Sequence, residues 1–98
     1  MQTYITLASF TQKGMERIKE GPARLDEAKK EFESLGARIK DFYLVMGPYD
    51  MVLVVEAPDD QTVAKLALTI GARGTSRTLT LRAFPETEYR EIVGELPG

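Results

Sequence analysis

The chain carries two kinds of hydrophobic pattern, one with the two-residue period of strands and one with the three-to-four-residue period of helices. Residues 3–10 have the first pattern, with Ile5 and Leu7 on one side and a mixed set of residues on the other. Residues 75–84 alternate in the same way. Because successive side chains of a strand point to opposite faces, both segments are predicted to be strands.

Three further segments are predicted to be helices. Apolar residues recur at steps of three and four along residues 22–35, which follow a short helical turn. Residues 60–70 have the same spacing, and Asp59 or Asp60 can cap this helix by accepting hydrogen bonds from the free amides of its first turn. An apolar stripe along residues 86–96 predicts a short C-terminal helix.

The centre of the chain is predicted to be a β-hairpin. Residues 37–46 and 51–57 are rich in apolar side chains and are joined by a polar turn at residues 47–50. In this turn Pro48 presets φ, and Asp50 can fold its carboxylate back onto nearby amides. The second run does not alternate, whereas a strand with one face in water should. Both faces of this strand are therefore expected to be covered.

The order β-α-β-β-α-β-α predicts an α+β, ferredoxin-like βαββαβ sandwich with a C-terminal helix, in a single domain over residues 1–98. In this fold the first and third strands are central, and both main helices cover one face of the sheet. The apolar third strand then requires cover on the other face as well. A second copy packed sheet to sheet gives a closed two-fold homodimer. The alternative is that the C-terminal helix folds across this face.

Polar side chains are expected on the face that a second copy would cover. The alternation places there several hydroxyls and one guanidinium, those of Tyr4, Thr6, Thr78, Thr80 and Arg82. Such groups among aliphatic side chains can line a ligand pocket. They can equally be ordinary strand residues of a plain dimer interface, with Arg82 paired to an acid across the seam. The sequence leaves both interpretations open.

Composition removes several classes of chemistry. The 98 residues include neither Cys nor His, which excludes thiolate nucleophiles, imidazole acid-base catalysis and Ser-His-Asp triads. We expect no metal site and no cofactor. With 13 basic and 15 acidic side chains the formal charge is −2, which argues against binding to nucleic acid. The sequence has neither a membrane-spanning stretch nor a signal-peptide pattern, so we expect a cytoplasmic protein without a membrane partner.

A set of short segments along the chain carries a family resemblance. They are Tyr4-Ile5-Thr6-Leu7, Phe42-Tyr43-Leu44, Gly47-Pro48-Tyr49-Asp50, Val55-Glu56-Ala57-Pro58-Asp59-Asp60 and Thr78-Leu79-Thr80-Leu81-Arg82-Ala83-Phe84. In this order they resemble the GYD-domain family of small bacterial and archaeal proteins, whose signature is Gly-x-Tyr-Asp. The resemblance covers nearly the whole chain. It implies a protein of the dimeric α/β-barrel type and implies no particular biochemical function.

The hairpin turn supplies the first candidate residues for chemistry. Tyr49 beside Asp50 can bind a polar ligand or act as an acid-base pair. We favour the structural interpretation, in which Asp50 accepts hydrogen bonds from turn amides and Tyr49 packs over the neighbouring strand end. Glu56 either faces the pocket opposite Arg82 or lies at the rim, because one residue of slip reverses its face. The full set of candidate ligand-binding residues is Tyr4, Thr6, Tyr43, Tyr49, Asp50, Glu56, Thr80 and Arg82.

These observations favour a regulatory or sensing protein that forms a homodimer or a higher oligomer and binds a small molecule at the sheet-to-sheet interface. The alternative is a cofactor-independent enzyme of the dimeric α/β-barrel type, similar to monooxygenases, isomerases or dehydratases of that fold. In such an enzyme Asp50, Glu56 or a tyrosine has to act as the acid or base. A structural assembly module is the third interpretation.

Overall fold

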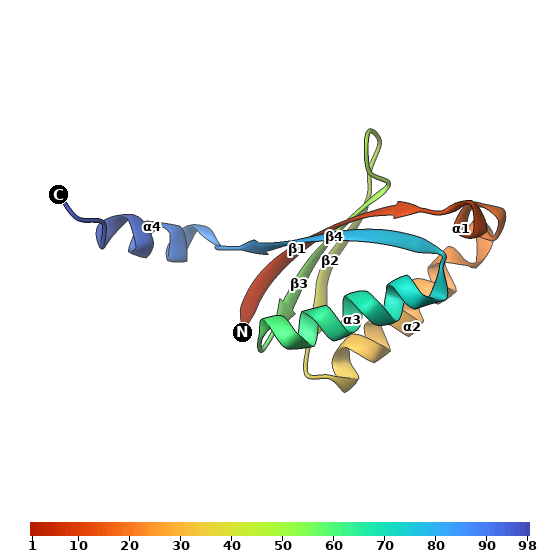
Figure 1. Ribbon diagram of the computed structural model, residues 1–98, viewed down its shortest axis with the longest axis horizontal. Helices are drawn as coiled ribbons and strands as arrows, with labels where there is room; N and C mark the ends of the chain where they lie inside the picture. Colours follow the sequence, from red (N-terminus) through yellow and green to blue (C-terminus); the bar gives the residue numbers. More distant parts are fainter.

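The computed structural model describes residues 1–98, and its elements follow the predicted order. They are β1 (Gln2–Phe10), α1 (Gln12–Glu16), the 3₁₀ helix η1 (Ile18–Glu20), α2 (Gly21–Ser34), β2 (Arg38–Leu44), β3 (Met51–Ala57), α3 (Asp60–Arg73), β4 (Ser76–Ala83) and α4 (Glu86–Gly94). The strands form one antiparallel sheet in the order β2-β3-β1-β4, and α2 and α3 lie on the same face of it (Figure 1). This is the predicted α+β, ferredoxin-like fold with a C-terminal helix. None of the helices combines the length and the apolar character that crossing a membrane requires.

Local sequence explains where the second main helix begins and ends. Asp59 is the N-cap of α3, and its Oδ1 accepts a hydrogen bond from the Thr62 amide at 2.8 Å. Hydrogen bonds from the backbone and side chain of Thr62 hold the pKa of the Asp59 carboxyl below its usual value. Gly74 ends the helix with a φ of 76°, a left-handed conformation that glycine adopts without steric cost.

The hairpin loop is longer than the predicted turn, and it is tied to β1. The last paired residues of β2 and β3 are Leu44 and Met51, so the second strand ends two residues before the predicted limit. The amide of Asp50 donates to the Ala8 carbonyl at 2.9 Å, and its Oδ2 accepts from the Phe10 amide at 2.9 Å. Asp50 therefore has a structural role, but its carboxylate accepts from an amide of β1 and not from the turn amides that were predicted.

The helices cover the mixed face of the sheet, which is the opposite of our prediction. Tyr4 is 3% exposed and Val55 is 1% exposed, and both pack in one core with Phe32 of α2 and Leu66 of α3. The wrong face was predicted for Tyr4, Thr6, Thr78, Thr80 and Arg82. The two-residue alternation separates the faces of a strand, but it does not say which of them the helices cover.

The face away from the helices is aliphatic and uncovered, and we call it the open sheet face. Its central side chains come from β1, β3 and β4 and are those of Ile5, Leu7, Val52, Val54, Leu79 and Leu81. Of these, Leu79 is 43% exposed and Leu81 is 48% exposed. The alternative prediction, that the C-terminal helix folds across this face, is wrong because α4 projects past the end of β4 and away from the sheet (Figure 1).

Candidate functional site

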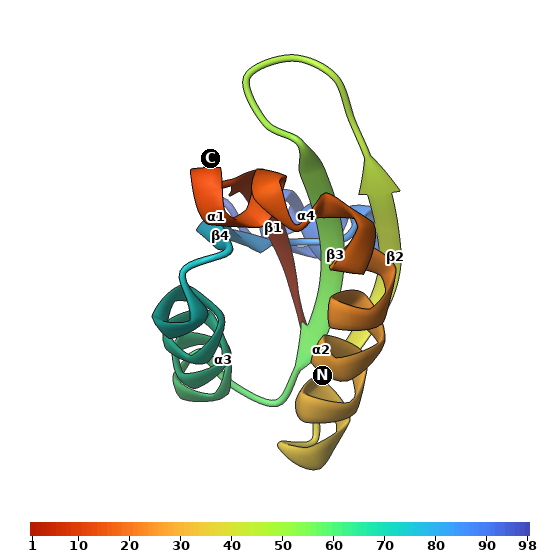
Figure 2. The same ribbon diagram turned by 90° about the vertical axis from the view of Figure 1, so that its right-hand side faces the viewer.

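A cavity lies between the sheet and the two main helices, and we call it the interlayer cavity. It has a volume of about 360 Å³. Helix α2 contributes Ala28 and Phe32 to its wall, and α3 contributes Leu66 and Ile70. Figure 2 shows α3 and α2 on opposite sides, with β4 and β1 above the space between them. Most of the lining is apolar, so the cavity suits a ligand with an apolar body.

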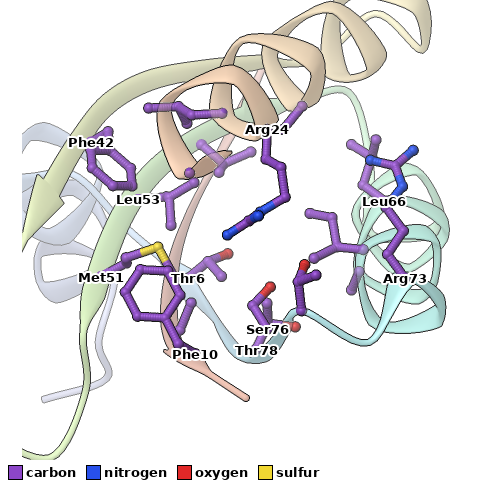
Figure 3. Close-up of a pocket in the computed structure, with 18 of the residues that line it drawn as sticks. Thr6, Phe10, Arg24, Phe42, Met51, Leu53, Leu66, Arg73, Ser76 and Thr78 are labelled. Atoms are coloured by element: carbon purple, nitrogen blue, oxygen red, sulfur yellow. The ribbon is translucent and has the colours of Figure 1, made fainter. Parts of the chain in front are cut away.

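One wall of the interlayer cavity carries a strip of hydroxyl groups. The residues of β4 that point toward the helices include Ser76, Thr78 and Thr80, and all of them line the cavity. Thr6 of β1 lies beside Thr80, with their Oγ1 atoms 3.1 Å apart. Figure 3 shows the side chains of Thr6, Ser76 and Thr78 along this wall. Because these side chains are short, they leave space that leucine or isoleucine would fill.

Arg24 of α2 extends into the interlayer cavity from the helix side (Figure 3). Its Nη1 donates to the Arg17 carbonyl at 3.0 Å and lies 3.6 Å from Oε2 of Glu20. Its Nη2 is buried and has no hydrogen-bond acceptor within the chain. A buried polar group without a partner is costly, and no other buried side-chain nitrogen or oxygen of this chain is in that state. Arg24 therefore has a buried N–H group free to donate a hydrogen bond within the cavity.

The other guanidinium at the cavity, that of Arg73 on α3, is already paired. Its Nη2 lies 2.5 Å from Oε2 of Glu31 on α2. This hydrogen bond holds the pKa of Arg73 above its ordinary value. The pair joins the two helices at the cavity and neutralises the charge of Arg73.

A smaller hollow lies at the start of α3 and brings together Tyr4, Asp60, Thr80 and Arg82. The Tyr4 hydroxyl lies 2.5 Å from Oδ1 of Asp60, to which it donates. The guanidinium carbon of Arg82 lies 5.6 Å from the centre of the Tyr4 ring and 4.4 Å from that of Phe84. Burial, followed by the hydrogen bond to Asp60, raises the pKa of Tyr4 to about 12. Tyr4 is thus a protonated hydrogen-bond donor at neutral pH.

The remaining predicted site residues lie away from both hollows, and they are Tyr43, Tyr49, Asp50 and Glu56. Glu56 forms an ion pair with Arg38 on the side of the open sheet face. Of the two placements predicted for Glu56, the structure has the one at the rim, because Arg82 lies on the opposite side of the sheet. The acidic residues do not gather in any group of three or more that could hold a metal ion.

Arg24, Ser76 and Asp60 line the two hollows but were not among the predicted site residues. Asp60 was interpreted only as a helix cap. Arg24 left a usable signal, since it precedes Ala28 by four residues and Phe32 by eight. These three residues form one row along the helix, so a charged residue occupies the row that was predicted to be buried.

Comparisons with known proteins agree with this architecture. The sequence pattern of the GYD domain matches residues 4–93. A protein of Thermus thermophilus named glutamine synthetase and cystathionine beta-lyase binding protein is 43% identical over 86 residues, which cover 87% of this chain and 90% of that protein. The crystal structure of TTHA0845, also from Thermus thermophilus, has the same fold, with a TM-score of 0.54 and 24% identity, covering 86% of this chain and 94% of that chain. The chain belongs to the GYD-domain family.

Proposed function

We propose that the protein is a homodimeric binding protein that docks onto an enzyme of amino-acid metabolism. The observation that carries this proposal is an excess of accessible surface. The chain exposes 6880 Å², whereas a compact monomer of 10.9 kDa exposes about 5600 Å². The excess of about 1300 Å² is larger than the roughly 800 Å² that one partner contributes to a standard protein interface.

The open sheet face is the surface that we assign to a second copy of the chain. Its centre is aliphatic, and the Arg38–Glu56 ion pair lies toward the edge of the sheet, between β2 and the end of β3. A charge-poor centre with a polar rim is the usual anatomy of a protein interface. Asp41 of β2 and Arg77 of β4 also lie on this face, outside its aliphatic centre. Each large aliphatic side chain that two copies bury contributes roughly 1.5–3 kcal/mol.

Helix α4 supports the same assembly. It carries Ile92 and Val93, which are 44% and 46% exposed, it is followed by Leu96, which is 61% exposed, and it extends beyond its own sheet (Figure 1). An apolar stripe on a helix is ordinarily buried against another element. In a two-fold dimer that pairs the open sheet faces, α4 of each protomer reaches past its own sheet and can bury this stripe on the partner.

The tip of the β2–β3 hairpin is the surface that we assign to the enzyme partner. Met46 is 98% exposed on a loop that stands out from the sheet (Figure 1), and Leu44, the last residue of β2 before this loop, is 73% exposed. Exposed apolar side chains on a projecting loop are typical of a binding surface. The name of the Thermus relative, which states that it binds glutamine synthetase and cystathionine beta-lyase, indicates the class of partner.

Sedimentation equilibrium at micromolar concentration tests the dimer. We expect the wild type to have twice the mass of the 10.9 kDa chain. Leu81→Asp should be monomeric, because it places a charge in the centre of the open sheet face. Leu68→Asp is the matched control, since Leu68 is 74% exposed on the outer side of α3 and should leave the mass unchanged. A monomeric wild type contradicts the dimer.

Enzyme binding is tested with the glutamine synthetase and the cystathionine beta-lyase of the source organism, each purified and immobilised for biolayer interferometry. We expect one of them to bind the wild-type protein. Met46→Asp should weaken this binding by about tenfold or more while the dimer mass stays the same. If neither enzyme binds, the proposed enzyme partner is wrong even when the dimer forms.

A further inference from the structure

We propose that the interlayer cavity binds a small carboxylate with an apolar body, and that Arg24 holds the carboxylate group. This site lies between the sheet and the helices, away from the open sheet face, and of the two exposed residues assigned to the hairpin surface only Leu44 also lines the cavity. The proposal of ligand binding therefore does not depend on whether the protein docks onto an enzyme. The features that support it are the unpartnered guanidinium nitrogen, the hydroxyl strip beside it, and the size and apolar character of the cavity.

The free side of Arg24 requires an acceptor. A guanidinium does not lose its proton in proteins, so burial of Nη2 cannot be relieved by deprotonation. Nη1 already donates to the Arg17 carbonyl at 3.0 Å, whereas Nη2 is buried without any acceptor from the chain. Figure 3 shows this guanidinium inside the cavity. An anionic oxygen of a ligand beside Nη2 forms a charge-assisted hydrogen bond, which is roughly twice as strong as a neutral one.

The charge balance of the cavity favours a monoanion. Glu31 lies only 2.5 Å from Nη2 of Arg73 and neutralises it, whereas the Glu20 carboxylate lies 3.6 Å from Nη1 of Arg24 and is 60% exposed to water. Nη2 of Arg24 therefore remains the cationic donor available to a ligand. The hydroxyls of Ser76 and Thr78 can donate to a second ligand oxygen without adding charge. A carboxylate has this single charge and two acceptor oxygens. A phosphate dianion would leave one negative charge uncompensated in an apolar site.

The rest of the cavity selects an apolar body of limited size. Leu25, Phe32, Leu53 and Ile70 are among the side chains that line it. An apolar cavity of about 150 Å³ holds one benzene molecule. The interlayer cavity, at about 360 Å³, therefore accommodates a ligand of roughly twice that size, such as a phenyl ring with a short chain or a medium-length alkyl chain.

Two matched pairs of probes distinguish recognition of the ligand's carboxylate group from burial of its apolar part. The carboxylates are 4-phenylbutyrate and octanoate, and the neutral partners are 4-phenyl-1-butanol and 1-octanol. Protein-observed NMR titration measures each dissociation constant and reports which amides respond. We expect at least one carboxylate to bind with a dissociation constant of roughly 1 mM or lower, its alcohol to bind about tenfold or more weakly, and the largest shifts to fall on Thr78 and its neighbours.

Variants of the protein test the assigned residue. Arg24→Met keeps the apolar stem and removes the charge. It should weaken binding of the carboxylate probe by roughly ten- to a hundredfold and leave binding of the alcohol probe unchanged. The matched control is Arg90→Met on α4, because Arg90 also pairs with a glutamate four residues earlier but lies far from the cavity. If Arg24→Met does not fold, Ala28→Leu fills the cavity from the same row of α2, leaves Arg24 in place, and should abolish binding of both probes of a pair.

Three results would overturn the proposal. The first is that neither carboxylate binds at millimolar concentration. The second is that acid and alcohol bind equally well and Arg24→Met changes neither, which would make the cavity an apolar site without anion recognition. The third is that binding persists in Ala28→Leu with shifts confined to another surface.

Discussion

Replacement of Gly14 by alanine is a sharp test of how α1 is seated against the sheet. A Cβ built on Gly14 comes 2.0 Å from the Thr75 carbonyl oxygen, whereas real Cβ atoms essentially never approach closer than 3.0 Å. The segment is held in place by Thr11, whose amide donates to the Thr75 carbonyl at 3.1 Å and whose hydroxyl donates to the Gly74 carbonyl at 2.5 Å. Alanine at position 14 therefore forces α1 away from the start of β4 by about 1 Å.

Two opposing effects decide the sign of the change in unfolding free energy. Alanine is favoured over glycine inside a helix by up to about 1 kcal/mol. Against this, the clash either remains as strain costing about 1–3 kcal/mol or is relieved by loss of the two Thr11 hydrogen bonds, at about 1 kcal/mol each. The steric effect is the larger, so Gly14→Ala should lower the free energy of unfolding by about 1–2 kcal/mol.

Urea unfolding followed by circular dichroism measures this change, at one fixed protein concentration because the stability of the proposed dimer would depend on concentration. Gly71→Ala is the matched control, since Gly71 lies in α3 and a Cβ built there meets no atom within 4 Å. This control should gain about 0.5–1 kcal/mol. If Gly14→Ala is as stable as the wild type while Gly71→Ala is stabilised, the close seating of α1 on Thr75 is refuted.

Three further predictions concern the core and the hydrogen bonds that position it. The pKa of Tyr4 is raised from 10.0 to about 12, so the protonated phenol contributes up to about 2.7 kcal/mol to the free energy of unfolding. This contribution is fully present below pH 10 and is lost as the pH rises to 12. The free energy of unfolding measured with urea should therefore fall more steeply between pH 10 and pH 12 in the wild type than in Tyr4→Phe. If it falls equally in both, the burial of this phenol is contradicted. Asp50→Ala removes the acceptor of the Phe10 amide and should cost about 1–2 kcal/mol and speed hydrogen exchange at that amide; unchanged exchange would show that Asp50 does not anchor the loop. Leu66→Ala, at a residue only 3% exposed, should cost about 2–5 kcal/mol in the same urea assay, and a cost below 1 kcal/mol would place Leu66 outside the core.

Several features followed from short stretches of sequence because their causes are local. The alternation of Ile5 and Leu7 predicted β1, and the steps of three and four residues predicted both main helices. Asp59 was predicted as one of two N-cap candidates for α3. Together with chain order, these local signals were enough for the ferredoxin-like topology, since few arrangements of such elements avoid crossed or left-handed connections.

The candidate site was only partly predictable. Thr6, Thr80 and Arg82 were correctly grouped with Tyr4 on one face of the sheet, because the period of a strand determines which side chains point the same way. The identity of the covered face was missed, and with it the location of the cavity. Arg24 was missed because a charged residue at the start of a helix ordinarily faces water.

By itself, the sequence determined the elements, their order and the set of side chains that share each face, because backbone periodicity and caps act over a few residues. Tertiary structure alone decided that the mixed face lies under α2 and α3, that the aliphatic face stays open, and that Nη2 of Arg24 is buried without an acceptor. These outcomes depend on how helices from distant parts of the chain pack on the sheet and on how much space their side chains leave between them. That information resides in contacts between layers and in no single segment.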